Sequence, residues 1–118
     1  MKLAVTVWGN RISPVFDAAT TLLVAEITDK KISGHYYTNF DPQSPMDLIH
    51  TLKKHHVNIL VCGAISKTPA GLILDQHIHL ISFVTGNVRQ FLDDFVLGRT
   101  VEKKNRMPGF NPSSMNVY

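Results

Sequence analysis

Three short segments of the chain combine a glycine with hydroxyl or cationic side chains. They are Trp8-Gly9-Asn10-Arg11-Ile12-Ser13, Cys62-Gly63-Ala64-Ile65-Ser66-Lys67 and Thr85-Gly86-Asn87, called below the first, second and third loops. Glycine lets the backbone approach a ligand, and a helix beginning just after such a loop presents free N–H groups and a positive dipole end. These features suit an anion, although strand–helix junctions are also rich in glycine for purely structural reasons. The candidate anion-binding residues are Asn10, Arg11, Ser13, Gly63, Ser66, Lys67, Thr85 and Gly86.

Cys62 is the only cysteine of the chain. One thiol excludes an intrachain disulfide, a multi-cysteine zinc site and an iron–sulfur cluster held by this chain's thiols alone. Two roles remain open. Cys62 is either a small buried apolar residue or a metal ligand whose pKa is lowered by the N-terminus of the helix that follows it.

Other catalytic patterns are missing from the sequence. It contains no Walker A motif and no G-x-G-x-x-G, so a nucleotide site lacks its usual phosphate-binding loop. A metal-dependent nuclease needs clustered carboxylates at strand ends, but Trp8 and Cys62 stand there instead. The six histidines form no chelating pattern at the expected site and are predicted to be structural or exposed. We therefore predict no catalytic residues.

Five strands and three helices must position the three loops. Apolar and β-branched runs predict strands at 3–7, 20–27, 31–38, 57–62 and 78–84. Ser44-Pro45 predicts the start of one helix, and a second begins at Ser66 or at Thr68-Pro69. Apolar residues at helical spacing predict a third helix from Val88 that ends at Gly98.

A hairpin followed by alternating helices and strands predicts a mixed α/β sheet. Right-handed crossovers give the strand order 3-2-1-4-5, with strand 2 antiparallel. This is the order of a ribonuclease H-like fold with three layers. From strand 1 the chain connects to one side of the sheet through the hairpin and to the other side through strands 4 and 5, so the connections separate between strands 1 and 4. Ligands of open α/β sheets bind at the carboxyl ends of the strands at such a point. The three loops are therefore expected to meet at that edge.

Length and charge limit the remaining possibilities. The chain has 118 residues, which predicts one domain at 1–100 and an extended or flexible basic segment at 101–118. That segment holds three cations and one acid, so it carries +2 of the net charge of +3. The remainder is nearly neutral, which argues against nucleic-acid binding. No apolar run is long enough for a membrane span, and a single cysteine fits a cytoplasmic protein.

Several of these segments match one known family. The opening stretch contains Gly9-Asn10-Arg11-Ile12-Ser13-Pro14-x-Phe16, and the later blocks are Leu22-Leu23-Val24-Ala25-Glu26-Ile27, Leu60-Val61-Cys62-Gly63-Ala64-Ile65-Ser66 and Thr85-Gly86-Asn87-Val88. On these residues the chain resembles, from residue 1 to about residue 99, the dinitrogenase iron–molybdenum cofactor biosynthesis family of the NifX and NifB C-terminal type. The resemblance implies a ribonuclease H-like fold. It also implies a non-catalytic protein that transiently binds or carries an iron–sulfur or iron–molybdenum type cluster, with cofactor-assembly or acceptor proteins as partners.

The chain departs from the family pattern in its first motif. Many members have a histidine where this chain has Val15, and some have a cysteine shortly afterwards, where Ala18 and Ala19 stand. A cluster would then depend on Cys62, or on a pocket that holds an anion by charge and backbone N–H groups. The alternative is a regulatory or partner-binding domain of the same fold that has lost cluster binding. A weaker third hypothesis is an enzyme acting on a phosphorylated small molecule.

Overall fold

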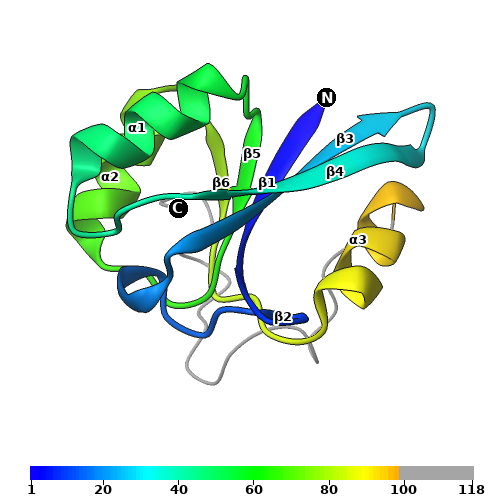
Figure 1. Ribbon diagram of the computed structural model, residues 1–118, viewed down its shortest axis with the longest axis horizontal. Helices are drawn as coiled ribbons and strands as arrows, with labels where there is room; N and C mark the ends of the chain where they lie inside the picture. Colours follow the sequence, from blue (N-terminus) through cyan, green and yellow to red (C-terminus); the bar gives the residue numbers. More distant parts are fainter. Residues whose placement is uncertain (99–118) are drawn as a thin grey trace.

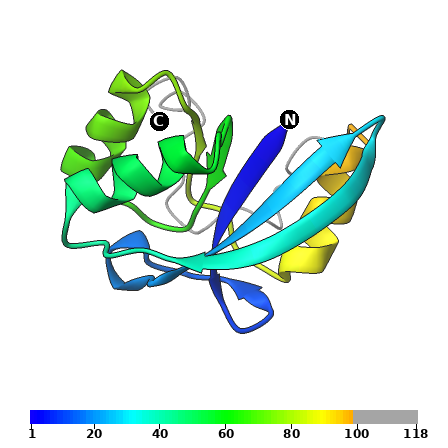
Figure 2. The same cartoon turned by 45° about the horizontal axis from the view of Figure 1, so that its top comes forward.

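The computed structural model describes residues 1–98 and shows one mixed sheet between two helical layers (Figures 1 and 2). The strands are β1 (Lys2–Trp8), β2 (Arg11–Ile12), β3 (Thr21–Thr28), β4 (Lys31–Asn39), β5 (Ile59–Val61) and β6 (His79–Ile81). The helices are α1 (Pro45–Lys54), α2 (Lys67–Asp75), α3 (Val88–Val96) and a short 3-10 helix at Phe16–Ala18. The prediction for 101–118 lies outside the described residues.

The predicted strand order is confirmed. The sheet runs β4-β3-β1-β5-β6, in which β3 lies antiparallel to β1 and to β4, whereas β5 and β6 continue parallel to β1. With helices on both faces, this is the predicted three-layer α/β fold.

The structure corrects several local predictions. The strands predicted at 57–62 and 78–84 are shorter and span Ile59–Val61 and His79–Ile81. Arg11 and Ile12 were expected to belong to a loop, but they form β2 and pair antiparallel with Trp8 and Val7 of β1. Gly9 adopts a φ of +63° in the turn between them, a left-handed conformation that glycine tolerates best. Two paired residues are too short to give a recognisable alternation in the sequence.

Strict alternation along the central strands divides the core in two. On β1, Leu3 and Val5 pack on the α3 side, whereas Ala4 packs on the side of α1 and α2. On β3, Leu23 packs on the α3 side and Leu22 packs on the side of α1 and α2. These strands are buried on both faces, which explains their nearly continuous apolar sequences.

The three helices begin as their sequences predict. The Ser44 hydroxyl accepts a hydrogen bond from the backbone N–H of Asp47 at 3.3 Å, at the start of α1. The Asn87 side chain caps α3 in the same way, by accepting from the N–H of Gln90 at 3.0 Å. Ser66 precedes α2, which matches the first of the two predicted starts.

The two faces of the sheet are covered unequally within residues 1–98. Two helices, α1 and α2, lie on one face, whereas α3 alone lies on the other (Figure 1). A hollow lies between α3 and the edge strand β4. No helix among the described residues is long and apolar enough to cross a membrane.

Candidate ligand-binding site

The first and third loops meet at the carboxyl edge of the sheet, as predicted. The backbone N–H of Ile12 donates to the carbonyl of Gly86 at 2.9 Å, and that of Val88 donates to the carbonyl of Asn10 at 2.9 Å. The Val88 N–H, one of the first donors of α3, is therefore already used within the protein. This start of α3 is held by the first loop and is not an open cradle for an anion.

The second loop joins the same assembly. The N–H of Ala64 donates to the carbonyl of Pro14 at 2.9 Å, and that of Phe16 donates to the carbonyl of Ala64 at 2.8 Å. The N–H of Phe83, just before the third loop, donates to the carbonyl of Gly63 at 3.0 Å. All three loops are thus linked through their backbones.

Gly63 has a packing role in this assembly. A Cβ atom at this position would overlap the carbonyl oxygens of Ser13 and Pro14. The absence of a side chain therefore lets the first and second loops pack backbone against backbone. The predicted role of Gly63 in holding an anion stays a prediction.

The remaining predicted site residues separate into different places. Arg11 is exposed on β2, whereas Ser13 is buried and donates from its hydroxyl to the carbonyl of Val15 at 3.2 Å. Ser66 donates to a carboxylate oxygen of Asp17 at 3.3 Å, beside the exposed Lys67 at the start of α2. Thr85 and Gly86 are half-buried within the third loop, where Gly86 has a φ of +121°.

Cys62 is completely buried in the core on the side of α1 and α2. Burial raises the pKa of its thiol far above the ordinary value, and the nearby carboxylate of Asp17 raises it further. The expectation that a helix N-terminus lowers this pKa is therefore wrong. The structure supports the first interpretation of Cys62, a small apolar core residue, and leaves its thiol out of reach of a surface ligand.

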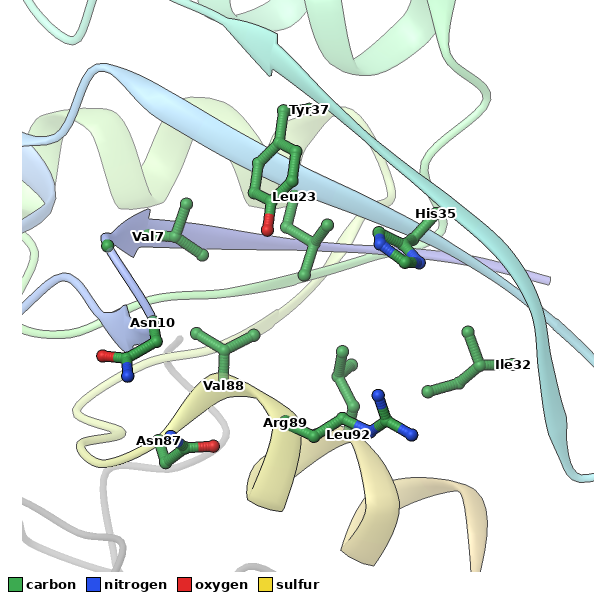
Figure 3. Close-up of a pocket in the computed structure, with 11 residues that line it drawn as sticks. Val7, Asn10, Leu23, Ile32, His35, Tyr37, Asn87, Val88, Arg89 and Leu92 are labelled. Atoms are coloured by element: carbon green, nitrogen blue, oxygen red, sulfur yellow. The ribbon is translucent and has the colours of Figure 1, made fainter.

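One hollow lies between α3 and β4, and we call it the α3 pocket (Figure 3). Its volume of about 410 Å³ lies within the ~300–1,000 Å³ common for small-ligand sites. It is lined by Val7, Gly9, Asn10, Leu23, Ile32, His35, Tyr37, Asn87, Val88, Arg89 and Leu92. No carboxylate is among these residues, and most of the polar ones can donate a hydrogen bond.

Two strand residues form one side of the α3 pocket. His35 and Tyr37 alternate along β4, so both project toward the same face of the sheet (Figure 3). Their rings make an edge-to-face contact with centroids 6.3 Å apart. Their register partners on β3 are the buried Ala25 and Leu23. These polar rings thus lie directly beside the apolar core.

The other side of the α3 pocket comes from the start of α3. Arg89 is the only lysine or arginine among the residues that line the pocket. Its Nε donates to a carboxylate oxygen of Asp93 at 3.2 Å, and this exposed i,i+4 pair uses one of the five guanidinium N–H groups. Asn87 uses its side-chain oxygen as the helix cap, which leaves an amide NH₂ as a donor.

A second hollow, the loop pocket, adjoins the first and has a volume of about 620 Å³. It is lined by Val7, Trp8, Gly9, Ser13, Pro14, Val15, Ala18, Ala19, Thr20, Thr21 and Tyr37. Val15, Ala18 and Ala19 are the positions at which the chain departs from the family pattern. No charged or metal-ligating side chain lines this pocket, so it is poorly suited to an anionic metal cluster.

Only part of the α3 pocket is predicted from the sequence. Asn10 was among the predicted residues, whereas His35, Tyr37 and Arg89 were not. The i,i+2 spacing of His35 and Tyr37 showed that they share a face. Their place in the pocket depends on how α3 packs beside β4, which no local pattern reveals.

The structure is thus a small ribonuclease H-like domain with a carboxylate-free pocket between α3 and β4. The chain belongs to the dinitrogenase iron-molybdenum cofactor family, whose model matches residues 1–98. Membership confirms the resemblance seen in the sequence, and it associates the chain with the synthesis or binding of the iron–molybdenum cofactor.

Solved structures share the fold. The crystal structure of PH0822 has a TM-score of 0.77 at 15% identity, and the match covers 87% of this chain and 96% of that one. A candidate dinitrogenase of Methanocaldococcus jannaschii has a TM-score of 0.65 at 19% identity, with 83% and 89% covered. The NMR structure of that protein gives a TM-score of 0.67 at 21% identity, with 83% and 88% covered. At these identities the likeness shows the fold alone. No curated protein matches the chain.

Proposed function

We propose that this protein is a small, non-catalytic cytoplasmic carrier. It binds a preformed iron–molybdenum or iron–sulfur type cluster in the α3 pocket and passes it to a cofactor-assembly or acceptor protein. Membership in the dinitrogenase iron-molybdenum cofactor family supports a metal–sulfur cluster as the cargo. The observation that carries the choice of site is the lining of the α3 pocket, which has a guanidinium, an imidazole and two amides but no carboxylate.

The pocket's donors suit such a cargo. Metal–sulfide clusters are generally anionic, and a guanidinium binds an anion more strongly than a neutral donor does. Asn10, Asn87 and Tyr37 add hydrogen-bond donors around the rim. His35 is the pocket's only side chain that readily ligates a metal. One imidazole ligand and a set of hydrogen bonds hold a cluster weakly enough for the protein to release it.

The same lining favours a cluster that arrives already assembled. Within residues 1–98, no three histidine, cysteine or acidic side chains lie close enough together to hold one metal ion. Iron–sulfur clusters built on a protein usually need several thiolate ligands, and the only thiol, Cys62, is buried. Iron and sulfide added separately should therefore give no bound cluster.

The test is anaerobic incubation of the full chain with a preformed iron–molybdenum–sulfur cluster, followed by desalting and absorption spectroscopy. We expect the protein fraction to keep the cluster's absorption. Arg89→Gln and His35→Gln should each reduce retention, whereas Lys54→Gln should not, because Lys54 lies on α1 across the sheet. Absence of bound chromophore under every condition, or equal retention by all these variants, would contradict the proposal.

The second candidate function is a partner-binding domain without cluster chemistry. Val15, at the position where many members have a histidine, favours it, because the loop pocket offers no metal ligand. A chain that never retains metal and still forms a complex with a cofactor-assembly protein would favour this alternative.

A further inference from the structure

We propose that the α3 pocket also accepts a small organic anion with a flat apolar body, such as an aryl sulfonate or an aryl carboxylate. This is a second class of ligand for the pocket. The inference rests on the pocket's apolar floor and does not depend on cluster binding.

The floor of the α3 pocket is the hydrophobic core itself. Five of its lining residues are aliphatic: Val7, Leu23, Ile32, Val88 and Leu92. Four of them are buried core residues, and Ile32 packs against the same cluster. A compact inorganic anion needs no such surface, whereas an organic ring would cover the partly exposed Ile32 and the small apolar area that the four buried residues leave at the hollow.

The α3 pocket lies on the face of the sheet that is covered by fewer helices. Within residues 1–98, the face that carries α3 has one helix, whereas the opposite face has two. A planar ligand between α3 and β4 would occupy part of the space that a second helix fills on the other side. The pocket's volume of about 410 Å³ is large enough for a ligand of up to three aromatic rings.

The polar groups around the hollow favour a ligand with a negative charge. Figure 3 shows Tyr37 and His35 extending from β4 on one side of the hollow, with Arg89 and Asn87 on α3 on the other. Asp93, which pairs with Arg89, is the nearby acid and is not among the lining residues. An anionic group at the rim would therefore meet a guanidinium and neutral donors, and a cationic group would not be favoured.

The probe for the test is 1-anilinonaphthalene-8-sulfonate, with N-phenyl-1-naphthylamine as the matched compound that lacks the sulfonate. Fluorescence titration of the full chain should show saturable binding of the sulfonate. Arg89→Gln should raise its Kd about threefold, as expected for an exposed ion pair, and should leave the Kd of the neutral compound unchanged. Ile32→Thr should weaken both compounds, and Lys54→Gln should weaken neither.

The position of the probe is checked by amide NMR spectra of the full chain with and without the sulfonate. We expect shifts concentrated at Gly9, Asn10, Tyr37 and Arg89. No saturable binding, equal binding by Arg89→Gln, or shifts centred on Val15 in the loop pocket would overturn the inference. Probe binding by a chain that retains no metal cluster would uphold the inference while contradicting the proposed carrier function.

Discussion

Burial sets the chemistry of Cys62, whose thiol is enclosed by the core beneath the second loop. Its raised pKa keeps it protonated at neutral pH, and a protonated thiol is a poor nucleophile and a poor metal ligand. At the scale of the residue, this removes the most obvious ligand from the candidate site and leaves His35 in its place.

We predict that Cys62 does not react with iodoacetamide in the native protein at pH 7 and reacts fully after unfolding in urea. Mass spectrometry of the alkylated chain measures both states. Cys62→Ala should also retain as much cluster as the unsubstituted protein. Rapid native alkylation, or loss of the cluster in this variant, would restore Cys62 as a ligand.

His55 links stability to pH. It ends α1, and its Nδ1 lies 2.8 Å from the hydroxyl of Tyr36 on β4. Burial lowers the pKa of His55 from its ordinary value of 6.5, and the charges of Lys54 and Lys2 lower it further. The folded state therefore binds a proton at His55 less readily than the unfolded state does. The contribution of neutral His55 to the free energy of unfolding is complete above about pH 6.5 and is lost as the pH falls.

We therefore predict a lower Tm for the native chain as the pH is reduced from 7 to 5, part of which disappears in His55→Gln. Thermal unfolding followed by circular dichroism at each pH measures this. His50→Gln, a change of another histidine on α1, serves as the control. An identical pH dependence in the native chain and His55→Gln would show that His55 makes no contribution.

At the scale of the elements, the close contact between the first and second loops depends on the absence of a side chain at Gly63. Gly63→Ala would drive a methyl group into the carbonyl oxygens of Ser13 and Pro14. We expect it to destabilise the protein by about 1–3 kcal/mol, as overpacking does in other cores. Urea unfolding gives this free energy directly.

Gly71→Ala is the matched control, because a Cβ at this position in α2 meets no atom within 4 Å. Alanine favours the helix over glycine, so this variant should be more stable by about 0.5–1 kcal/mol. Equal effects of the two substitutions would contradict the packing role of Gly63.

The turn between β3 and β4 shows how far local sequence predicts an element. The strands predicted at 20–27 and 31–38 leave a short connection that contains no glycine, and its residues Asp29 and Lys30 form a tight turn with φ values of +52° and +61°. Positive φ at both central positions suits the twist of a hairpin. The apolar runs and the helix caps predicted the other main elements for equally local reasons.

The candidate site was less predictable than the fold. The convergence of the three loops followed from the strand order, but their mutual backbone hydrogen bonds did not. Those bonds occupy donors that the sequence assigned to an anion. The pocket formed instead where β4 and α3 diverge, and its residues His35 and Arg89 lie far apart in the chain. Only the tertiary arrangement brings them together.

At the scale of the whole molecule, the unequal covering of the sheet provides the site. The face beneath α1 and α2 has a closed core that includes Cys62, whereas the α3 face opens to solvent along β4. A carrier needs an accessible pocket supported by a rigid sheet, so that cargo can enter and leave without unfolding. The pocket includes Val7 near the carboxyl end of β1 but extends toward β3 and β4, away from the predicted switch point between β1 and β5.

The most direct test of the carrier function is the iron and molybdenum content of the full chain after anaerobic incubation with a preformed iron–molybdenum–sulfur cluster and desalting. We predict about one cluster per chain for the native protein and for Cys62→Ala, and substantially less for the double variant His35→Gln and Arg89→Gln. A native chain without metal, or a double variant as fully loaded as the native chain, would contradict the account.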